Sequence, residues 1–361
     1  MPLPLNTTSQ ITADEISELL PTLEAVRANC HIADARHATD YTLCVYLLKM
    51  REYFRWEHSL PFNEQLPHQQ LTEWLTQRET HWESLEQHDF EKIPVLDTQH
   101  DPFDAETINR TLNPLGYVYS SGYGRNMKPM FYLGALESRE TYNGYTLIIS
   151  GKEYARDLAS PPAMSLGKTI FVRRESLRRM LWEKIEEWRW NKPANAMQNA
   201  LGCYDFDNDA EQSLDAMTDN ELHAVKLHEI GEIRAGELLG PEWEEMLASM
   251  PHSKAEIMVR AVRDHLADAL STLPGLLSEM NAASLHFYIA NMANMRKELF
   301  PSLITAYESW VTNRDTQTFE RLTAGAAAHW QTLADKILRL YKQQDSDYQQ
   351  KLISLIESNA L

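Results

Sequence analysis

The segment KLHEIGEIRAGELLG, residues 226–240, carries a histidine and acidic residues at spacings that suit metal chemistry. Zinc peptidases of the His-Glu-x-x-His type need a second imidazole four residues after the first, so that both rings face one metal. His228 and Glu229 begin this pattern, but Glu232 occupies the position of the second histidine. The sequence therefore does not support a peptidase, and it leaves a His–Glu pair one helical turn apart.

Four helical segments each place a histidine on a face rich in small or apolar residues. Successive residues of a helix rotate by about 100°, so side chains three or four positions apart share a face. Three of the four histidines share that face with a carboxylate, which needs a partner if it is buried. The candidate metal ligands are His31 with Asp34, His228 with Glu232, His265 with Asp268, and His286.

Imidazole and carboxylate groups together suit iron, with manganese or zinc as alternatives. Di-iron and di-manganese sites are built from carboxylate-bearing helices around a bundle core, although those proteins use Glu-x-x-His. This chain has His-x-x-Asp at 31–34 and 265–268. We expect a metal-dependent helical-bundle protein of the non-haem di-iron oxidoreductase type, acting on a small molecule, with Glu229 as the catalytic or bridging carboxylate.

A second interpretation treats the histidines as ordinary hydrogen-bonded core residues. The protein would then be a non-enzymatic interaction or assembly protein, with a tyrosine-rich sheet and an arginine-rich helix that dock a protein partner or a second copy of the chain. The tyrosines lie within residues 115–155 and the arginines within residues 173–190.

Basic residues cluster at two places in an otherwise acidic chain. Arg173 and Arg174 begin the segment RRESLRR, and Arg125 lies in the loop SSGYGRNMKP. If the sheet folds against this helix, these guanidinium groups form a cofactor or substrate site for an anion, since arginine pairs bidentately with carboxylate or phosphate. The alternative is that the arginines pair with glutamates on a solvated helix face.

Three familiar motifs are incomplete. PAMSLGKT, residues 162–169, ends like a phosphate loop, but Pro162 replaces the first glycine and the strand-like TIFV follows. DFDNDAEQSLDA, residues 205–216, starts like a calcium loop, but Ala210 and Ala216 replace the required glycine and glutamate. An acidic helix N-terminus explains it better. The chain has no G-x-S-x-G nucleophile elbow.

The composition narrows the classes of protein further. The 361 residues carry a net charge of −18, which disfavours binding to the phosphate backbone of nucleic acids. No apolar run reaches the roughly 18 residues of a membrane span, and the first residues do not resemble a signal peptide. Three cysteines without a CxxC pair argue against a disulfide framework. We expect a cytoplasmic protein.

The hydrophobic pattern predicts a mainly α protein: a multi-helix bundle with a small antiparallel β insertion, in the α+β class. Helical spacing appears in residues 12–57, 69–87 and 173–361, which places the N-terminal helices in residues 1–88 and the C-terminal helical bundle in residues 166–361. Pro241, Pro251, Pro274 and Pro301 divide the second stretch. Residues 89–165 contain strand-like segments with a hairpin turn at Asn143–Gly144. We expect these residues to form an insertion or a flap on a helical bundle that contains the N-terminal and C-terminal helices, and the alternative is a separate sheet domain.

Two segments resemble an uncharacterised family of bacterial proteins of about this length. They are CHIADARHATDYTLCVYLLKMREYFRWE, residues 30–57, and RDLASPPAMSLGKTIFVRRESLRRMLWEKIEEWRW, residues 156–190. The resemblance covers most of the chain and implies a bacterial, cytoplasmic protein. It implies no activity and no functional residue.

Overall fold

The computed structural model describes residues 13–124, 127–142, 144–292, 294–314, 316–343 and 347–361. The chain divides into two compact units, residues 1–179 and 180–361. No helix within the described ranges combines the length and the apolar character that crossing a bilayer requires.

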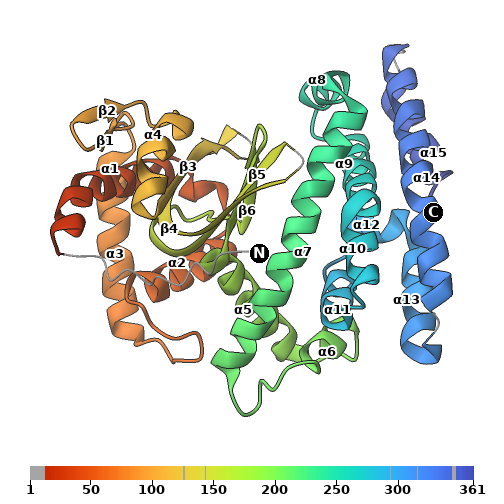
Figure 1. Ribbon diagram of the computed structural model, residues 1–361, viewed down its shortest axis with the longest axis horizontal. Helices are drawn as coiled ribbons and strands as arrows, with labels where there is room; N and C mark the ends of the chain where they lie inside the picture. Colours follow the sequence, from red (N-terminus) through yellow and green to blue (C-terminus); the bar gives the residue numbers. More distant parts are fainter. Residues whose placement is uncertain (1–12, 125–126, 143, 293, 315, 344–346) are drawn as a thin grey trace, which may run out of the picture. The chain divides into compact units, whose positions relative to one another are not determined.

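The first unit contains three N-terminal helices followed by the strands of two sheets (Figure 1). Its helices are α1 (Ala13–His37), the 3-10 helix η1 (Ala38–Asp40), α2 (Leu43–Glu57), α3 (His68–Leu85), α4 (Ala105–Leu112) and η2 (Asn113–Leu115). Its strands are β1 (Ile93–Val95), β2 (Thr98–His100), β3 (Tyr117–Tyr123), β4 (Pro129–Tyr142), β5 (Tyr145–Arg156), β6 (Ala163–Leu166) and β7 (Thr169–Arg173). Helix α5 (Arg174–Asn191) follows and runs across the division between the units.

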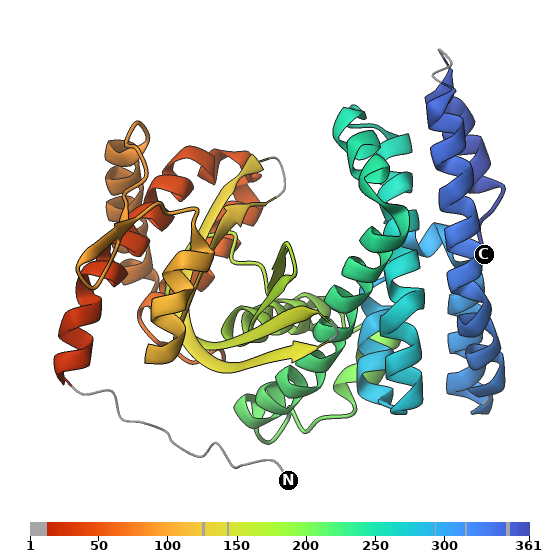
Figure 2. The same ribbon diagram turned by 45° about the horizontal axis from the view of Figure 1, so that its top comes forward.

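The main sheet is mixed and has the strand order β3-β4-β5-β7-β6. β4 and β5 form a long antiparallel hairpin that pairs as far as Tyr142 and Tyr145, while Asn143 of the predicted turn lies outside the described residues. β5 and β7 run parallel. Figure 2 shows that the long strands curl strongly.

The sheet is larger than the small antiparallel insertion that the sequence predicts. It has five strands, includes a parallel pair, and continues to Arg173 instead of ending near residue 165. Residues 169–173 do form the strand suggested by TIFV, and Gly167 turns between β6 and β7 with φ 58°, which explains why Gly-Lys-Thr is no phosphate loop. The α+β class is confirmed.

The core of the first unit lies between α1 and the sheet. Ala25, Val26 and Cys30 of α1 are buried with aromatic residues of the strands, among them Tyr119 and Phe131. Small residues on this face of α1 allow it to approach β4 and β5 closely. Helix α1 therefore packs on the sheet within the first unit.

The second unit is helical throughout the part that the structure describes. Its helices are α6 (Ala196–Leu201), α7 (Ala210–Leu239), α8 (Pro241–Ser249), α9 (Lys254–Ala267), the π-helical turn η4 (Asp268–Thr272), α10 (Leu273–Ser278), α11 (Ala282–Asn291), α12 (Asn294–Leu299), α13 (Pro301–Asn313), α14 (Thr316–Lys342) and α15 (Tyr348–Glu357).

Local signals set most of these helix boundaries. Pro241 and Pro301 stand at the first positions of α8 and α13, where the missing N–H costs nothing. The Asp209 carboxylate caps α7 by accepting a hydrogen bond from the Gln212 N–H, so the acidic run is a helix N-terminus, as predicted. Gly240 ends α7 with φ 73°.

Candidate functional site

Two predicted residues of the second unit, His228 of α7 and Asp268 of η4, are joined by a hydrogen bond. The His228 Nδ1 atom lies 3.0 Å from the Asp268 Oδ1 atom. The buried carboxylate also accepts hydrogen bonds from the Thr272 hydroxyl, the Tyr288 hydroxyl and the Arg296 guanidinium. These four donors occupy the acceptor positions of a carboxylate, so in this arrangement Asp268 has none left for a metal.

The charges of this network favour an ionised pair. Burial opposes the charged form of Asp268, but Arg296 and His228 outweigh it and lower its pKa. Burial likewise opposes protonation of His228, yet the hydrogen bond and the charge of Asp268 raise its pKa to about 9. His228 is therefore an imidazolium at neutral pH, a form that does not bind metals.

The other predicted residues of this unit have partners of their own or stand apart. Glu232 pairs with Arg263 at 3.1 Å. Glu229 lies half-buried next to this pair, and burial raises its pKa. Glu229 lies near His228 and Glu232, but among the described residues it forms no hydrogen bond with either side chain.

His265 and His286 face different surroundings from His228. The His265 Nε2 atom lies 2.9 Å from the Arg296 carbonyl oxygen, and its ring stacks on Trp330 with a centroid distance of 4.8 Å. Burial and then Arg296 lower the pKa of His265 to about 4. His286 Nδ1 instead contacts the Tyr307 hydroxyl at 2.8 Å.

His31 and Asp34 belong to the first unit, and their side chains contact different elements. The His31 Nδ1 atom accepts a hydrogen bond from the Trp82 indole at 3.2 Å. The Asp34 carboxylate accepts the Leu158 N–H at 2.9 Å and lies 3.9 Å from the Lys128 ammonium. Burial, and then Asp157, raise the pKa of Asp34 to about 7.

Within the ranges that the structure describes, no three His, Cys, Asp or Glu side chains are grouped so that they could hold a metal ion. The iron expectation stays a prediction, which elemental analysis of the purified protein decides.

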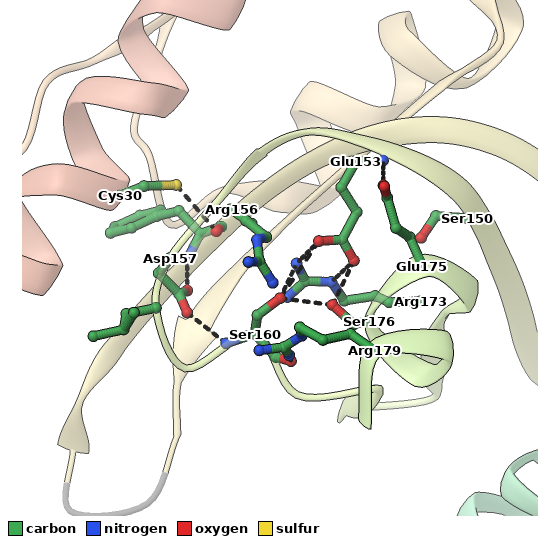
Figure 3. Close-up of polar contacts among 12 residues, drawn as sticks. Cys30, Ser150, Glu153, Arg156, Asp157, Ser160, Arg173, Glu175, Ser176 and Arg179 are labelled. Atoms are coloured by element: carbon green, nitrogen blue, oxygen red, sulfur yellow. Dashed lines mark hydrogen bonds and ion pairs between the residues drawn. The ribbon is translucent and has the colours of Figure 1, made fainter. Parts of the chain in front are cut away.

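Arg173 is buried in an ion pair with Glu153 of β5 (Figure 3). The Arg173 Nε atom lies 2.8 Å from Glu153 Oε1, and its Nη2 atom lies 2.6 Å from Oε2. Burial favours a neutral Glu153, but Arg173 outweighs it and lowers the pKa of that carboxyl. The Arg173 guanidinium is therefore buried and paired with an internal carboxylate. Arg174 lies half-buried at the start of α5, and Arg125 lies outside the described residues.

The same ion pair holds the loop after β5. The Ser160 hydroxyl accepts a hydrogen bond from Arg173 at 2.9 Å, and the Ser160 carbonyl accepts one from Arg179 at 2.6 Å. Ser160 has φ 39°, a conformation that residues other than glycine rarely adopt. The buried charges thus tie β5, its following loop, β7 and α5 into one rigid support.

A cavity of about 370 Å³ opens beside this support. Helix α1 contributes Arg27 and His31, which are four residues apart and share a face. Helix α2 contributes Tyr53, Trp56 and Glu57, again at helical spacing. Strand β5 contributes residues 152–154, and the first turn of α5 contributes Glu175. Four elements therefore converge on one hollow within the first unit.

Strand β5 departs from regular pairing at the point where it lines the cavity. Leu133 pairs with Ala155 and Leu136 pairs with Ser150, so three steps along β4 match five steps along β5. Extra residues of this kind bend a strand and redirect its side chains. Residues 152–154 all contribute to the cavity lining, whereas strict alternation sends neighbouring side chains to opposite faces.

The cavity combines aromatic rings with cations. The Arg27 Nε atom donates to the Tyr154 carbonyl oxygen at 3.1 Å, and the Lys152 ammonium lies 5.9 Å from the centre of the Tyr154 ring. Among the described residues, no carboxylate forms an ion pair with Arg27 or Lys152. Trp56, on another wall, covers the buried Arg156 guanidinium at 4.8 Å.

Two of the three carboxylates at this cavity are already neutralised. Arg78 holds Glu57 at 2.6 Å, and Arg173 holds Glu153. Burial, and then the charge of Glu153, raise the pKa of Glu175. Arg27 and Lys152 therefore outweigh the remaining negative charge, although the whole chain carries −18.

Comparison with protein families assigns both halves of the chain. Residues 22–173 match the N-terminal domain, and residues 178–359 the C-terminal domain, of DUF6866, a family of unknown function. The chain belongs to the DUF6866 family. The two DUF6866 domains meet close to the division between the structural units at residues 179 and 180. No curated protein and no solved structure matches the chain.

The cavity of this DUF6866 protein was not predicted from the sequence. Arg27 lies in α1, far along the chain from Lys152 of β5 and Glu175 of α5, and no motif marks these three residues. The sequence does predict an anion site near this part of the sheet, but it assigns that site to Arg125, Arg173 and Arg174. The guanidinium group of Arg173 binds an internal carboxylate, however, and the cations that reach the cavity are Arg27 and Lys152.

Proposed function

We propose that the N-terminal domain of this DUF6866 protein binds a small molecule in which an anionic group is attached to a planar ring. The observation that carries the proposal is that one cavity contains an aromatic wall together with two cations, Arg27 and Lys152, that form no ion pair with a carboxylate among the described residues. Its volume of about 370 Å³ falls within the range of about 300–1,000 Å³ that is usual for ligand sites.

The anionic part of the ligand follows from the charges. Arg27 and Lys152 flank Tyr154, so an anion at this point meets two donors. A cavity with low-dielectric walls concentrates the field of these cations, which attracts anions even to an acidic protein.

The planar part follows from the rings. Tyr53, Trp56 and Tyr154 supply flat apolar surface, and the Arg156 guanidinium packs over the Trp56 ring at 4.8 Å. Rings of this kind favour offset or edge-to-face contacts with another ring, worth about 0.5–1.5 kcal/mol beyond burial.

Calorimetric titration with four small probes tests the proposal. Benzenesulfonate and phenyl phosphate carry both features, benzyl alcohol carries only the ring, and inorganic sulfate carries only the charge. We expect the first two to bind more tightly than the last two. The variants Arg27→Ala and Lys152→Ala should each weaken benzenesulfonate binding about tenfold, which corresponds to about 1.4 kcal/mol.

Exposed cations elsewhere in the first unit provide matched controls. Arg110 of α4 and Lys168 of the β6–β7 turn are exposed and do not line the cavity. Arg110→Ala and Lys168→Ala should leave the affinity unchanged. Failure of every probe to bind, or equal affinity in the Arg27 and Lys152 variants and the wild type, would reject the proposed site.

A further inference from the structure

Among the described residues, Glu175 is the carboxylate of the cavity that forms no ion pair with a cation. It lies in the first turn of α5, directly after β7. Its Oε2 atom accepts the Glu153 N–H at 2.5 Å, which directs the carboxyl group toward β5 (Figure 3). The Glu153 carboxylate points to Arg173 instead. Glu175 lines the same cavity as Arg27 and Lys152, so an anion held by these cations would lie in the cavity that contains its carboxyl group.

The charged groups around Glu175 come from every wall of the cavity. On β5, Glu153 disfavours the ionised form of Glu175, while Lys152 and Arg156 favour it, and burial decides the balance by raising the pKa. On the other walls, Arg27 of α1 adds a positive charge. Glu57 of α2 and His31 of α1 change the net charge of the cavity little, because Glu57 is paired with Arg78 and His31 is neutral. Burial and Arg78 lower the pKa of His31 to about 3, so that it stays neutral above pH 5.

An ionised Glu175 and a bound anion repel each other. A protonated Glu175 instead donates a hydrogen bond to the anion and removes that repulsion. We propose that the cavity takes up one proton together with each anion, and that Glu175 carries this proton. The inference rests on the proposed function and adds its regulation: affinity for the anion rises as the pH falls.

The test uses the 361-residue chain and benzenesulfonate, whose sulfonate stays ionised throughout the range from about pH 5 to pH 8. Titrations in two buffers with different heats of ionisation count the protons taken up on binding. Above the pKa of free Glu175, we expect the wild type to take up close to one proton, and its affinity to fall by up to tenfold for each pH unit.

Two variants separate Glu175 from the other groups. Glu175→Gln keeps an oxygen that can accept the Glu153 N–H and an uncharged donor for the anion. We expect it to bind benzenesulfonate without proton uptake and with little dependence on pH. Glu106→Gln, a change at an exposed carboxylate of α4, should behave as the wild type does.

The outcomes distinguish this inference from the proposed function. Binding by the wild type without proton uptake overturns the inference and leaves the anion site intact, and so does a Glu175→Gln variant that keeps the pH dependence. Absence of binding at every pH overturns both. The proton count for the wild type holds whether or not the variant folds.

Discussion

At the scale of single residues, the His228–Asp268 pair links the stability of the second unit to pH. The pKa of His228 is about 9 in the folded protein, against roughly 6.5 for an unperturbed histidine. The folded state therefore binds the proton more tightly than the unfolded state. The resulting stabilisation is fully present below about pH 6.5 and is lost as the pH rises through 9.

We expect the free energy of unfolding to fall between about pH 6.5 and pH 9 through this pair. His228→Gln, which cannot titrate, should flatten that part of the curve, as measured by urea unfolding at a series of pH values. His68→Gln, at an exposed residue of the first unit, is the control. An equal pH dependence in His228→Gln and the wild type would contradict the assignment.

At the scale of elements, two glycines of α7 make a matched pair. A Cβ atom at Gly231 would lie 2.3 Å from the Ala267 carbonyl oxygen, whereas a Cβ at Gly236 would meet nothing within 4 Å. The absence of a side chain at Gly231 therefore lets α7 approach the end of α9 closely. Gly236 has no such role.

Gly231→Ala should destabilise the protein by about 1–3 kcal/mol, because backbone must move to relieve the overlap. Gly236→Ala should stabilise it by up to about 1 kcal/mol, since alanine is the better helix former. Thermal or urea unfolding of the two variants measures the difference. Equal stability of the two would show that the helices have room at residue 231.

At the scale of the whole molecule, each unit has its own hydrophobic core. Trp243, Phe300 and Trp330 belong to the core of the second unit, while the α1–sheet core belongs to the first. Helix α5 is tied to the first unit by Glu175 and by Ser176, whose hydroxyl donates to Glu153 at 2.6 Å. A fragment ending after α5 therefore retains the complete cavity.

We expect residues 1–192 to fold independently and to bind benzenesulfonate with the affinity of the 361-residue chain. Circular dichroism checks the fold, and calorimetry checks the affinity. A soluble, folded fragment that does not bind would show that the cavity requires the C-terminal domain.

Much of the secondary structure could be predicted from the sequence because its causes are local. Aromatic, β-branched and glycine residues indicate the strands within residues 115–137 and 143–155, and helical spacing indicates the segments on either side, whereas β6 at residues 163–166 was not expected. Pro241, Pro301 and the capping Asp209 set helix ends by constraints within a few residues. Charge and hydropathy likewise follow directly from composition.

The tertiary structure alone decided which side chains meet. His228 and Asp268 were both candidate ligands, but their contact depends on how α7 packs on η4. The hydrogen bonds that Tyr288 and Arg296 donate to the Asp268 carboxylate likewise depend on the packing of elements. The cavity depends further on two extra residues in β5, whose effect on side-chain direction appears only after the strands have paired. Contacts between elements distant along the chain are set by packing of whole faces, and no short stretch of sequence contains that information.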